Sequence, residues 1–208
     1  MVSNNCDKLK AQHYLLMTDK EIINLIIEGD RNLYRKIVER YQTMVFRICI
    51  GFLHNKNDAD DLSQDIFIQA YTSLSRFKGD SAFSTWLYRI AVNACLNRTR
   101  KAKFHFLRVG DSVETREISI PIAHFDEPDN ILMRKEQEEI FQKVLDSLKE
   151  NQRTAIVLSK YDDLSQREIA EIMGISEGNV ESLLFRAKAN LREKLATFYK
   201  NRIKTKEI

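Results

Sequence analysis

The sequence predicts an all-α protein made of two small helical domains joined by a linker. Its 208 residues include only six glycines and two prolines, and its hydrophobic residues (43%) recur at three- and four-residue steps. A sheet-rich fold would need more turn residues, whereas helix formers dominate here. The length allows two modest cores. We expect an N-terminal tail at 1–17, domains at 18–103 and 130–208, and a linker at 104–129.

The first domain is expected to be a four-helix bundle. The apolar spacing predicts helices that start after Thr18, after Asp30, at Asn57 or Asp58, and at about Phe83. Thr18 and Glu21 have the spacing of a capping box, and Gly29 can end the first helix. The fourth helix is expected to end near Lys103.

The linker is predicted where this periodicity fails. Both prolines, Pro121 and Pro128, lie between residues 104 and 129, and acidic residues return there. Such a composition is typical of a connection between two folded units.

Charge is clustered along the chain although the formal net charge is only +3. Residues 81–110 contain no Asp or Glu but several basic residues, whereas Asp58, Asp60, Asp61 and Asp65 crowd together just upstream. Any binding of nucleic acid must therefore come from a local surface and not from the overall field.

The third predicted helix carries an acidic and amide face opposite its core residues. This face comprises Asp58, Asp61, Gln64, Asp65 and Ile68. It would repel phosphates, and it suits a protein partner that places basic side chains around a small apolar contact. The alternative is a plain solvated helix face.

The fourth predicted helix and the loop before it have the opposite character. The helix presents Trp86, Arg89, Asn93, Asn97 and Arg100 on one face, and the loop contributes Phe77, Lys78, Gly79, Asp80, Ser81 and Phe83. Aromatic, guanidinium and amide groups suit unpaired bases and their phosphate backbone, and the loop could house a base extruded from a duplex. The alternative for Trp86 is a position in the core.

The most specific local pattern is QREIAEIMGISEGNVESLLF at 166–185, which predicts a helix-turn-helix. Ser165 and Glu168 form a capping box. Small Ala170, Gly174 four residues later and Val180 six residues after that have the spacing of a DNA-reading unit.

The second helix of this unit is expected to enter a major groove. Its outward residues are Glu177, Asn179, Glu181, Ser182, Phe185, Arg186 and Lys188. Arg186 could pair with a guanine, Glu181 with a cytosine amino group, and Phe185 with a thymine methyl group. The alternative is a helical hairpin that serves packing alone.

Other kinds of function find little support in the sequence. Cys6, Cys49 and Cys95 are odd in number and far apart along the chain, which indicates reduced thiols. The histidines are isolated, and no nucleotide-binding loop or nucleophile–base pattern occurs. We expect no metal, no cofactor, no small-molecule substrate and no catalysis. With no long apolar run, the protein is expected to be cytoplasmic.

The strings DADDLSQDIFIQAY and FKGDSAFSTWLYRIAVNACLNRTRK resemble region 2 of the extracytoplasmic-function (ECF) sigma factors of bacterial RNA polymerase. LSQREIAEIMGISEGNVESLLFRAKANLREKL resembles their region 4. The resemblance covers about 18–103 and 130–195, with the two regions in the family's order. A polymerase-independent helix-turn-helix regulator is the competing interpretation, and it would leave the first domain unexplained.

The resemblance implies partners and roles. The acidic face would dock on the clamp helices of the largest polymerase subunits, the Trp86 face and the 77–83 loop would bind the −10 element, and the helix from Glu177 would read the −35 element. The polymerase flap and promoter DNA complete the implied partners. Family members are usually held inactive by an anti-sigma factor, often membrane-bound. Many relatives carry a basic residue at the position of Glu181, so the −35 sequence does not carry over.

Overall fold

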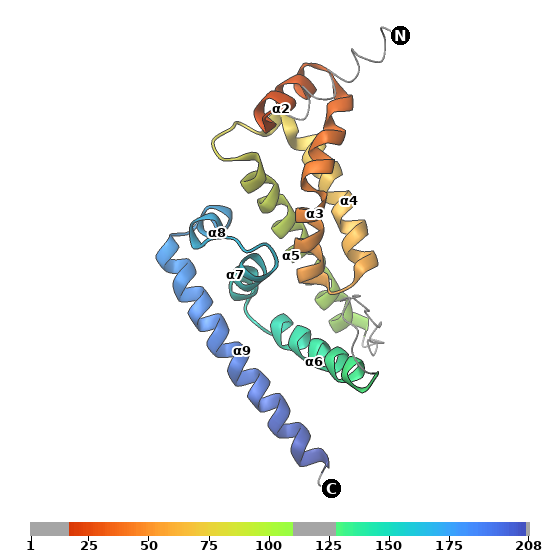
Figure 1. Cartoon of the computed structure of the whole chain (residues 1–208), viewed down its shortest axis with the longest axis vertical. Coiled ribbons are helices and arrows are strands. Elements are labelled where there is room, and N and C mark those ends of the chain that lie inside the picture. The colour runs from red at the N-terminus through yellow and green to blue at the C-terminus, as the bar shows by residue number, and fades with distance from the viewer. Residues whose placement is uncertain (1–16, 110–127, 207–208) are drawn as a thin grey trace.

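The computed structural model describes residues 17–109 and 128–206, and every regular element in these two ranges is a helix (Figure 1). The predicted all-α class is confirmed. The predicted N-terminal tail up to residue 16, with Cys6, and the part of the predicted linker at 110–127 lie outside the described residues. Within the described residues, no helix is both long enough and apolar enough to cross a membrane.

The N-terminal bundle has the four long helices that the spacing predicts. In chain order its elements are α2 (Asp19–Glu28), the 3-10 turn η1 (Arg31–Leu33), α3 (Tyr34–Leu53), α4 (Lys56–Ser73), the 3-10 turn η2 (Leu74–Arg76) and α5 (Phe83–Val109). The fully buried Ile37, Ile48, Ile66 and Leu87 belong to the core between α3, α4 and α5.

Two of the predicted helix starts differ from the structure. Asp30 makes no side-chain capping bond, and a 3-10 turn precedes α3 instead. The third helix, α4, begins at Lys56, because the side chain of Asn55 accepts a hydrogen bond from the backbone N–H of Asp58 at 3.0 Å and caps the helix. The capping box of Thr18 and the Gly29 cap of α2 form as predicted.

The helices on either side of the linker are longer than expected. α5 continues past Lys103 to Val109, since no glycine or proline interrupts it before Gly110. α6 (Pro128–Asp146) starts at a proline, which suits the first turn of a helix because its missing N–H would have no intrahelical partner there.

The C-terminal unit continues with α7 (Glu150–Tyr161), α8 (Gln166–Met173) and the long α9 (Glu177–Lys206). α7 and α8 lie between the N-terminal bundle and α9 (Figure 1), with α7 packed against α3 and α8 packed against α5. One continuous set of buried side chains runs through both units. The two domains therefore pack directly on one another.

Candidate nucleic-acid interface

The acidic face predicted on the third helix lies on the outer side of α4. Asp61, Gln64 and Asp65 are exposed, and Ile68 is 63% exposed, which is unusual for an isoleucine. Asp58 differs from the others because it is half-buried and pairs with Arg98 of α5 at 3.6 Å. Four of the five residues thus offer acidic, amide and apolar groups to a partner.

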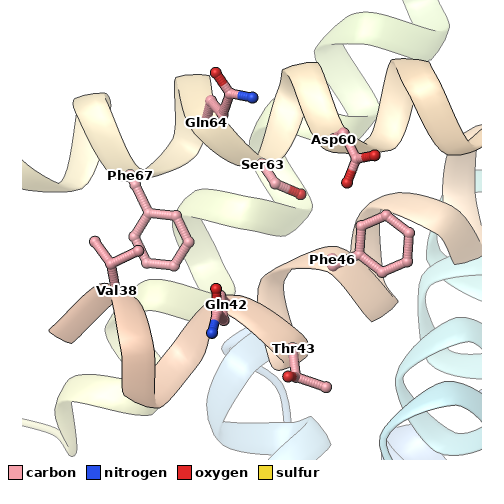
Figure 2. Close-up of a pocket in the computed structure, with 8 residues that line it drawn as sticks. All are labelled: Val38, Gln42, Thr43, Phe46, Asp60, Ser63, Gln64 and Phe67. Atoms are coloured by element: carbon pink, nitrogen blue, oxygen red, sulfur yellow. The ribbon is translucent and has the colours of Figure 1, made fainter. Parts of the chain in front are cut away.

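A groove of about 510 Å³ borders this face between α3 and α4 (Figure 2). Val38 and Phe67 face one another at one end, and the carboxylate of Asp60 points toward Phe46 at the other. Gln64 belongs to both the groove and the acidic face. The groove therefore continues the acidic face with the same combination of groups, because it places the rings of Phe46 and Phe67 beside the Asp60 carboxylate.

An aromatic cluster fixes the loop between η2 and α5. The rings of Phe77 and Phe83 are 5.5 Å apart, and each lies 5.4 Å from the ring of Trp86. Phe83 is only 3% exposed, so it lies in the core and not on the surface where we expected it. Phe77 and Trp86 are half-buried and serve the core while keeping part of their surface in solvent.

The loop that this cluster supports is open to solvent. Lys78, Gly79 and Asp80 are exposed, and Ser81 is half-exposed. Gly79 has a φ of 79°, a left-handed conformation that favours glycine. The loop therefore presents backbone, hydroxyl and charged groups beside Trp86, as the sequence predicts.

The polar residues of the α5 face are exposed, but two of them are already engaged. Asn93 and Asn97 are free to face solvent, whereas Arg89 donates a hydrogen bond to the backbone carbonyl of Glu171 in α8 at 2.6 Å. Arg100 makes two bonds to the carboxylate of Glu150 in α7, at 2.7 and 2.5 Å. The C-terminal unit thus occupies both arginines.

The helix-turn-helix has the predicted internal geometry. Ser165 and Glu168 form the capping box that starts α8. Gly174, with a φ of 67°, adopts the left-handed conformation that ends α8 and turns the chain toward α9. Ala170 and Val180 are buried where the two helices cross.

The predicted reading residues all lie on the surface of α9. Each of these residues is exposed: Glu177, Asn179, Glu181, Ser182, Phe185, Arg186 and Lys188. Phe185 is 75% exposed, the largest exposed fraction among the large hydrophobic side chains described. The Nε of Arg186 donates to the carbonyl of Ser182 at 3.1 Å, which leaves the end of the guanidinium available.

Two thiols that are far apart in sequence meet in the bundle. The sulfurs of Cys49 in α3 and Cys95 in α5 are 3.9 Å apart, and both residues are fully buried and unbridged. The hydrogen bond with Cys49 and burial raise the pKa of the Cys95 thiol. The proximity of the two thiols has no sequence signal, because it depends on which helix faces cross.

A buried polar cluster between the domains also escaped prediction. Arg153 of α7 is only 4% exposed and pairs with Asp146 at 2.7 Å. Asp146 also contacts the Nε2 of His54, at 2.9 Å. A buried arginine is rare unless it is paired. The sequence signal available was weak: Arg153 lies two residues before the apolar run 155–158.

Together, the fold and the helix-turn-helix define a two-domain, all-α DNA-binding protein. Family models agree: the Sigma-70 region 2 model matches residues 37–105, and the Sigma-70, region 4 model matches residues 138–191.

Curated relatives show the family. The chain is 34% identical to the ECF RNA polymerase sigma-E factor of Haemophilus influenzae over 183 residues, which covers 86% of this chain and 96% of the relative. It is 32% identical over 180 residues to the RNA polymerase sigma-H factor of Pseudomonas aeruginosa, covering 82% and 90%. The chain belongs to the ECF sigma factors, and it acts in transcription initiation.

Solved structures share the fold. CnrH in complex with the cytosolic domain of CnrY matches with a TM-score of 0.58 and 25% identity, over 86% of this chain and 97% of CnrH. The sigma factor RpoE of Bartonella quintana, in complex with the anti-sigma factor NepR, matches in fold with a TM-score of 0.59 and 23% identity, over 78% of this chain and 96% of RpoE.

Proposed function

We propose that this sigma factor uses three separate surfaces: the α4 face for core polymerase, the α5 face with the 77–83 loop for the −10 element, and α9 for the −35 element. The observation that carries the proposal is the segregation of charge, because one domain holds an exposed acidic face on α4 and an acid-free face on the neighbouring α5. A single partner could not complement both faces.

The α4 face suits the clamp helices of the largest polymerase subunits. Asp61, Gln64 and Asp65 would pair with basic side chains, while Ile68 provides an apolar anchor of the kind found at the centre of protein interfaces. The groove beside Gln64 adds apolar surface bordered by a carboxylate.

The α5 face suits the opened −10 element. Trp86 can stack on an unpaired base, and Asn93 and Asn97 can bond base edges, while Arg89 and Arg100 provide charge for the backbone. The exposed 77–83 loop, held by the aromatic cluster, would accept a flipped base. Capture of unstacked bases would offset the few kcal/mol that unstacking costs.

The α9 surface suits the −35 duplex. The side chains of Phe185 and Arg186 project from the helix after the turn and can reach a thymine methyl group and a guanine edge. Because both domains belong to one chain, binding of one promoter element raises the effective concentration of the other domain at its own element.

The remaining parts of the proposal concern partners and location. The chain acts by binding without catalysis, in the cytoplasm where polymerase and promoter DNA are found. We include an anti-sigma factor among its partners, since RpoE is seen with NepR and CnrH is seen with the cytosolic domain of CnrY. Co-purification of the tagged chain from cells in which its promoters are silent would test this part.

The test of the three surfaces is transcription with sigma-free core polymerase on genomic fragments, followed by sequencing of the 5′ ends. We expect start sites that share two upstream elements. Asp61→Lys should abolish initiation and binding to core, whereas Glu28→Lys, which makes the same charge change on exposed α2 surface, should do neither.

Substitutions in the two DNA surfaces should separate their roles. Arg186→Ala should weaken selection of the −35 element but retain core binding, and Arg31→Ala on the N-terminal bundle is its matched control. Asn93→Ala should slow promoter opening without changing −35 selection. If no start site appears with folded protein and competent core, the proposal fails.

A further inference from the structure

Beyond the residues that we assigned to the −35 element, α9 continues as a strongly basic helix. The Sigma-70, region 4 model ends at residue 191, whereas α9 runs on to Lys206. Residues 192–206, the α9 extension, contain six Lys or Arg residues and a single acidic residue, Glu193. This segment alone carries more positive charge than the whole chain, whose net charge is +3.

We propose that the α9 extension binds duplex phosphates beside the −35 element, whatever the base sequence there. This inference rests on the proposed role of α9 at the −35 element. It adds a second contact of a different kind, because phosphate contacts contribute affinity and position but do not read the sequence.

The cations of the extension are open to solvent. Arg192, Lys194 and Lys200 are exposed, and in the described part of the chain none of the three makes an ion pair. In Figure 1 the C-terminal end of α9 extends past α6, α7 and α8. The sequence adds Arg202 and Lys204 before α9 ends. Lysine and arginine side chains without an internal partner are the groups that neutralise phosphates.

The extension and the reading residues belong to one continuous helix. α9 has 30 residues, and a helix of this size is about 45 Å long. A major groove is only about 12 Å wide and winds around the duplex. If Phe185 and Arg186 reach base edges, a straight helix of this length leaves the groove and passes the sugar–phosphate backbone at its border.

The reading face of α9 continues into the extension. Residues seven positions apart lie on nearly the same side of an α-helix, and Phe185, Arg192 and Tyr199 have this spacing. All three are exposed. Guanidinium and tyrosine hydroxyl groups both bond phosphate oxygens. Side chains that suit phosphates therefore follow, on one face, the side chain that we assigned to a thymine methyl group.

The extension suits a duplex better than a membrane surface. A helix that lies on a membrane needs a broad apolar face opposite its charges. Between residues 192 and 200, Leu195 packs against the core, and Phe198 and Tyr199 are only 38% and 42% exposed, with ring centres 6.3 Å apart. The exposed apolar surface is small, whereas the positive charge is large.

Changes of charge in the full chain test this contact. The triple variant Arg192→Gln, Lys194→Gln and Lys200→Gln removes three positive charges at exposed positions and keeps residues that favour a helix. Glu193→Gln is the reverse change, since it removes the acidic side chain of the extension.

The matched control removes the same charge from exposed positions of the N-terminal bundle, by combining Lys20→Gln, Arg31→Gln and Lys56→Gln. The readout is the affinity of the full chain for two fluorescein-labelled duplexes of equal length, measured over a series of salt concentrations. One duplex carries the −35 element of a mapped promoter, and in the other this element is scrambled.

We expect the triple variant to weaken binding to both duplexes by the same factor. Its slope of log affinity against log salt concentration should fall by about 2 to 3, because each lost phosphate contact removes about 0.9. Glu193→Gln should strengthen binding to both duplexes, and the control should behave as the wild-type protein does.

An unchanged slope in the triple variant, or an equal change in the control, would overturn the inference. A triple variant that keeps duplex binding but no longer sediments with vesicles of phosphatidylcholine and phosphatidylserine would overturn it in favour of a membrane surface. Failure of the proposed function would look different: Arg186→Ala would then leave the preference for the −35 duplex over the scrambled duplex unchanged, whatever the extension does.

Discussion

Capping residues decide where the helix-turn-helix begins. The Ser165 hydroxyl accepts a hydrogen bond from the backbone N–H of Glu168 at 3.3 Å and donates one to the Glu168 carboxylate at 2.6 Å. Ser165→Ala removes both bonds. We expect the free energy of unfolding to fall by about 1 kcal/mol. Urea unfolding of the full chain measures the loss, with Ser75→Ala on exposed η2 as the control. Equal effects of the two substitutions would contradict the assignment.

The same capping bonds give this helix a pH dependence. Hydrogen bonds from Ser165 lower the pKa of the Glu168 carboxyl. A lowered folded-state pKa contributes stability that is present above the unfolded-state pKa and is lost as the pH falls through the lowered value. Ser165→Ala should therefore cost most near neutrality and progressively less in acid.

Gly174 and Gly178 offer a comparison within a few residues. Gly174 has a left-handed φ of 67°, so Gly174→Ala should destabilise the protein by about 1 kcal/mol or more and weaken −35 binding. Gly178 lies inside α9 with open space around it, so Gly178→Ala should stabilise the helix by up to about 1 kcal/mol. Thermal unfolding should show shifts of opposite sign, and shifts of the same sign would contradict this account.

Sequence reasoning succeeded for residues whose role is local. Capping boxes and the left-handed glycine depend on neighbours three or four positions away, and they appear as predicted. It failed where long-range packing decides. We expected Phe83 at the surface because it lies between a loop and the start of a helix. Its side chain instead packs in the core beside Phe77 and Trp86. Cys49 and Cys95 meet only because two helix faces cross.

At the scale of elements, α4 presents an apolar side chain with no role in the core. Ile68 is 63% exposed, so Ile68→Ala should leave the free energy of unfolding nearly unchanged. We expect its affinity for core polymerase to fall about tenfold, since a central interface anchor contributes more than 1 kcal/mol. Ile27→Ala on α2, which is 53% exposed, is the matched control. Competition with a labelled wild-type sigma factor measures the affinity.

Helix existence was predictable and helix ends were less so. Apolar periodicity extends over several turns and located each long helix of the bundle. The ends depend on single hydrogen bonds. α4 begins directly after Asn55, and not at Asn57 or Asp58, because the Asn55 side chain accepts a hydrogen bond from the backbone N–H of Asp58. The long α5 shows that a change of composition near residue 104 does not end a helix unless a residue there breaks it.

For the whole molecule, the domain contact should respond to pH. Burial raises the pKa of the Asp162 carboxyl, which faces Tyr88 of α5, Arg47 of α3 and the neighbouring Asp163. A raised folded-state pKa contributes stability that is fully present below the unfolded-state pKa and is lost as the pH rises through the folded value. Acidification from neutrality should therefore strengthen this part of the contact.

The measurement is the difference in free energy of unfolding between the wild-type protein and Asp162→Asn across a pH series. Other titrating groups cancel in this difference, because they are common to both proteins. We expect the wild-type protein to gain on the variant as the pH falls. A difference that stays constant, or that moves the other way, would show that the carboxyl does not titrate in this contact.

The domain arrangement was beyond the sequence. Each domain has its own helical pattern, but nothing in the pattern of either says that α7 and α8 rest on α3 and α5. Only the structure shows that Arg153 is buried, and a buried arginine requires partners, which here include a backbone carbonyl of the other domain.

The internal bonds of Arg89 and Arg100 have a consequence for competing nucleic acids. If α5 binds unpaired bases as we propose, any single strand could compete for it through charge and stacking alone. In the free protein such a strand must replace the Glu171 carbonyl and the Glu150 carboxylate as partners of these two exposed arginines. We therefore expect competitors to bind less tightly than a strand that polymerase and duplex contacts hold beside α5 at a promoter.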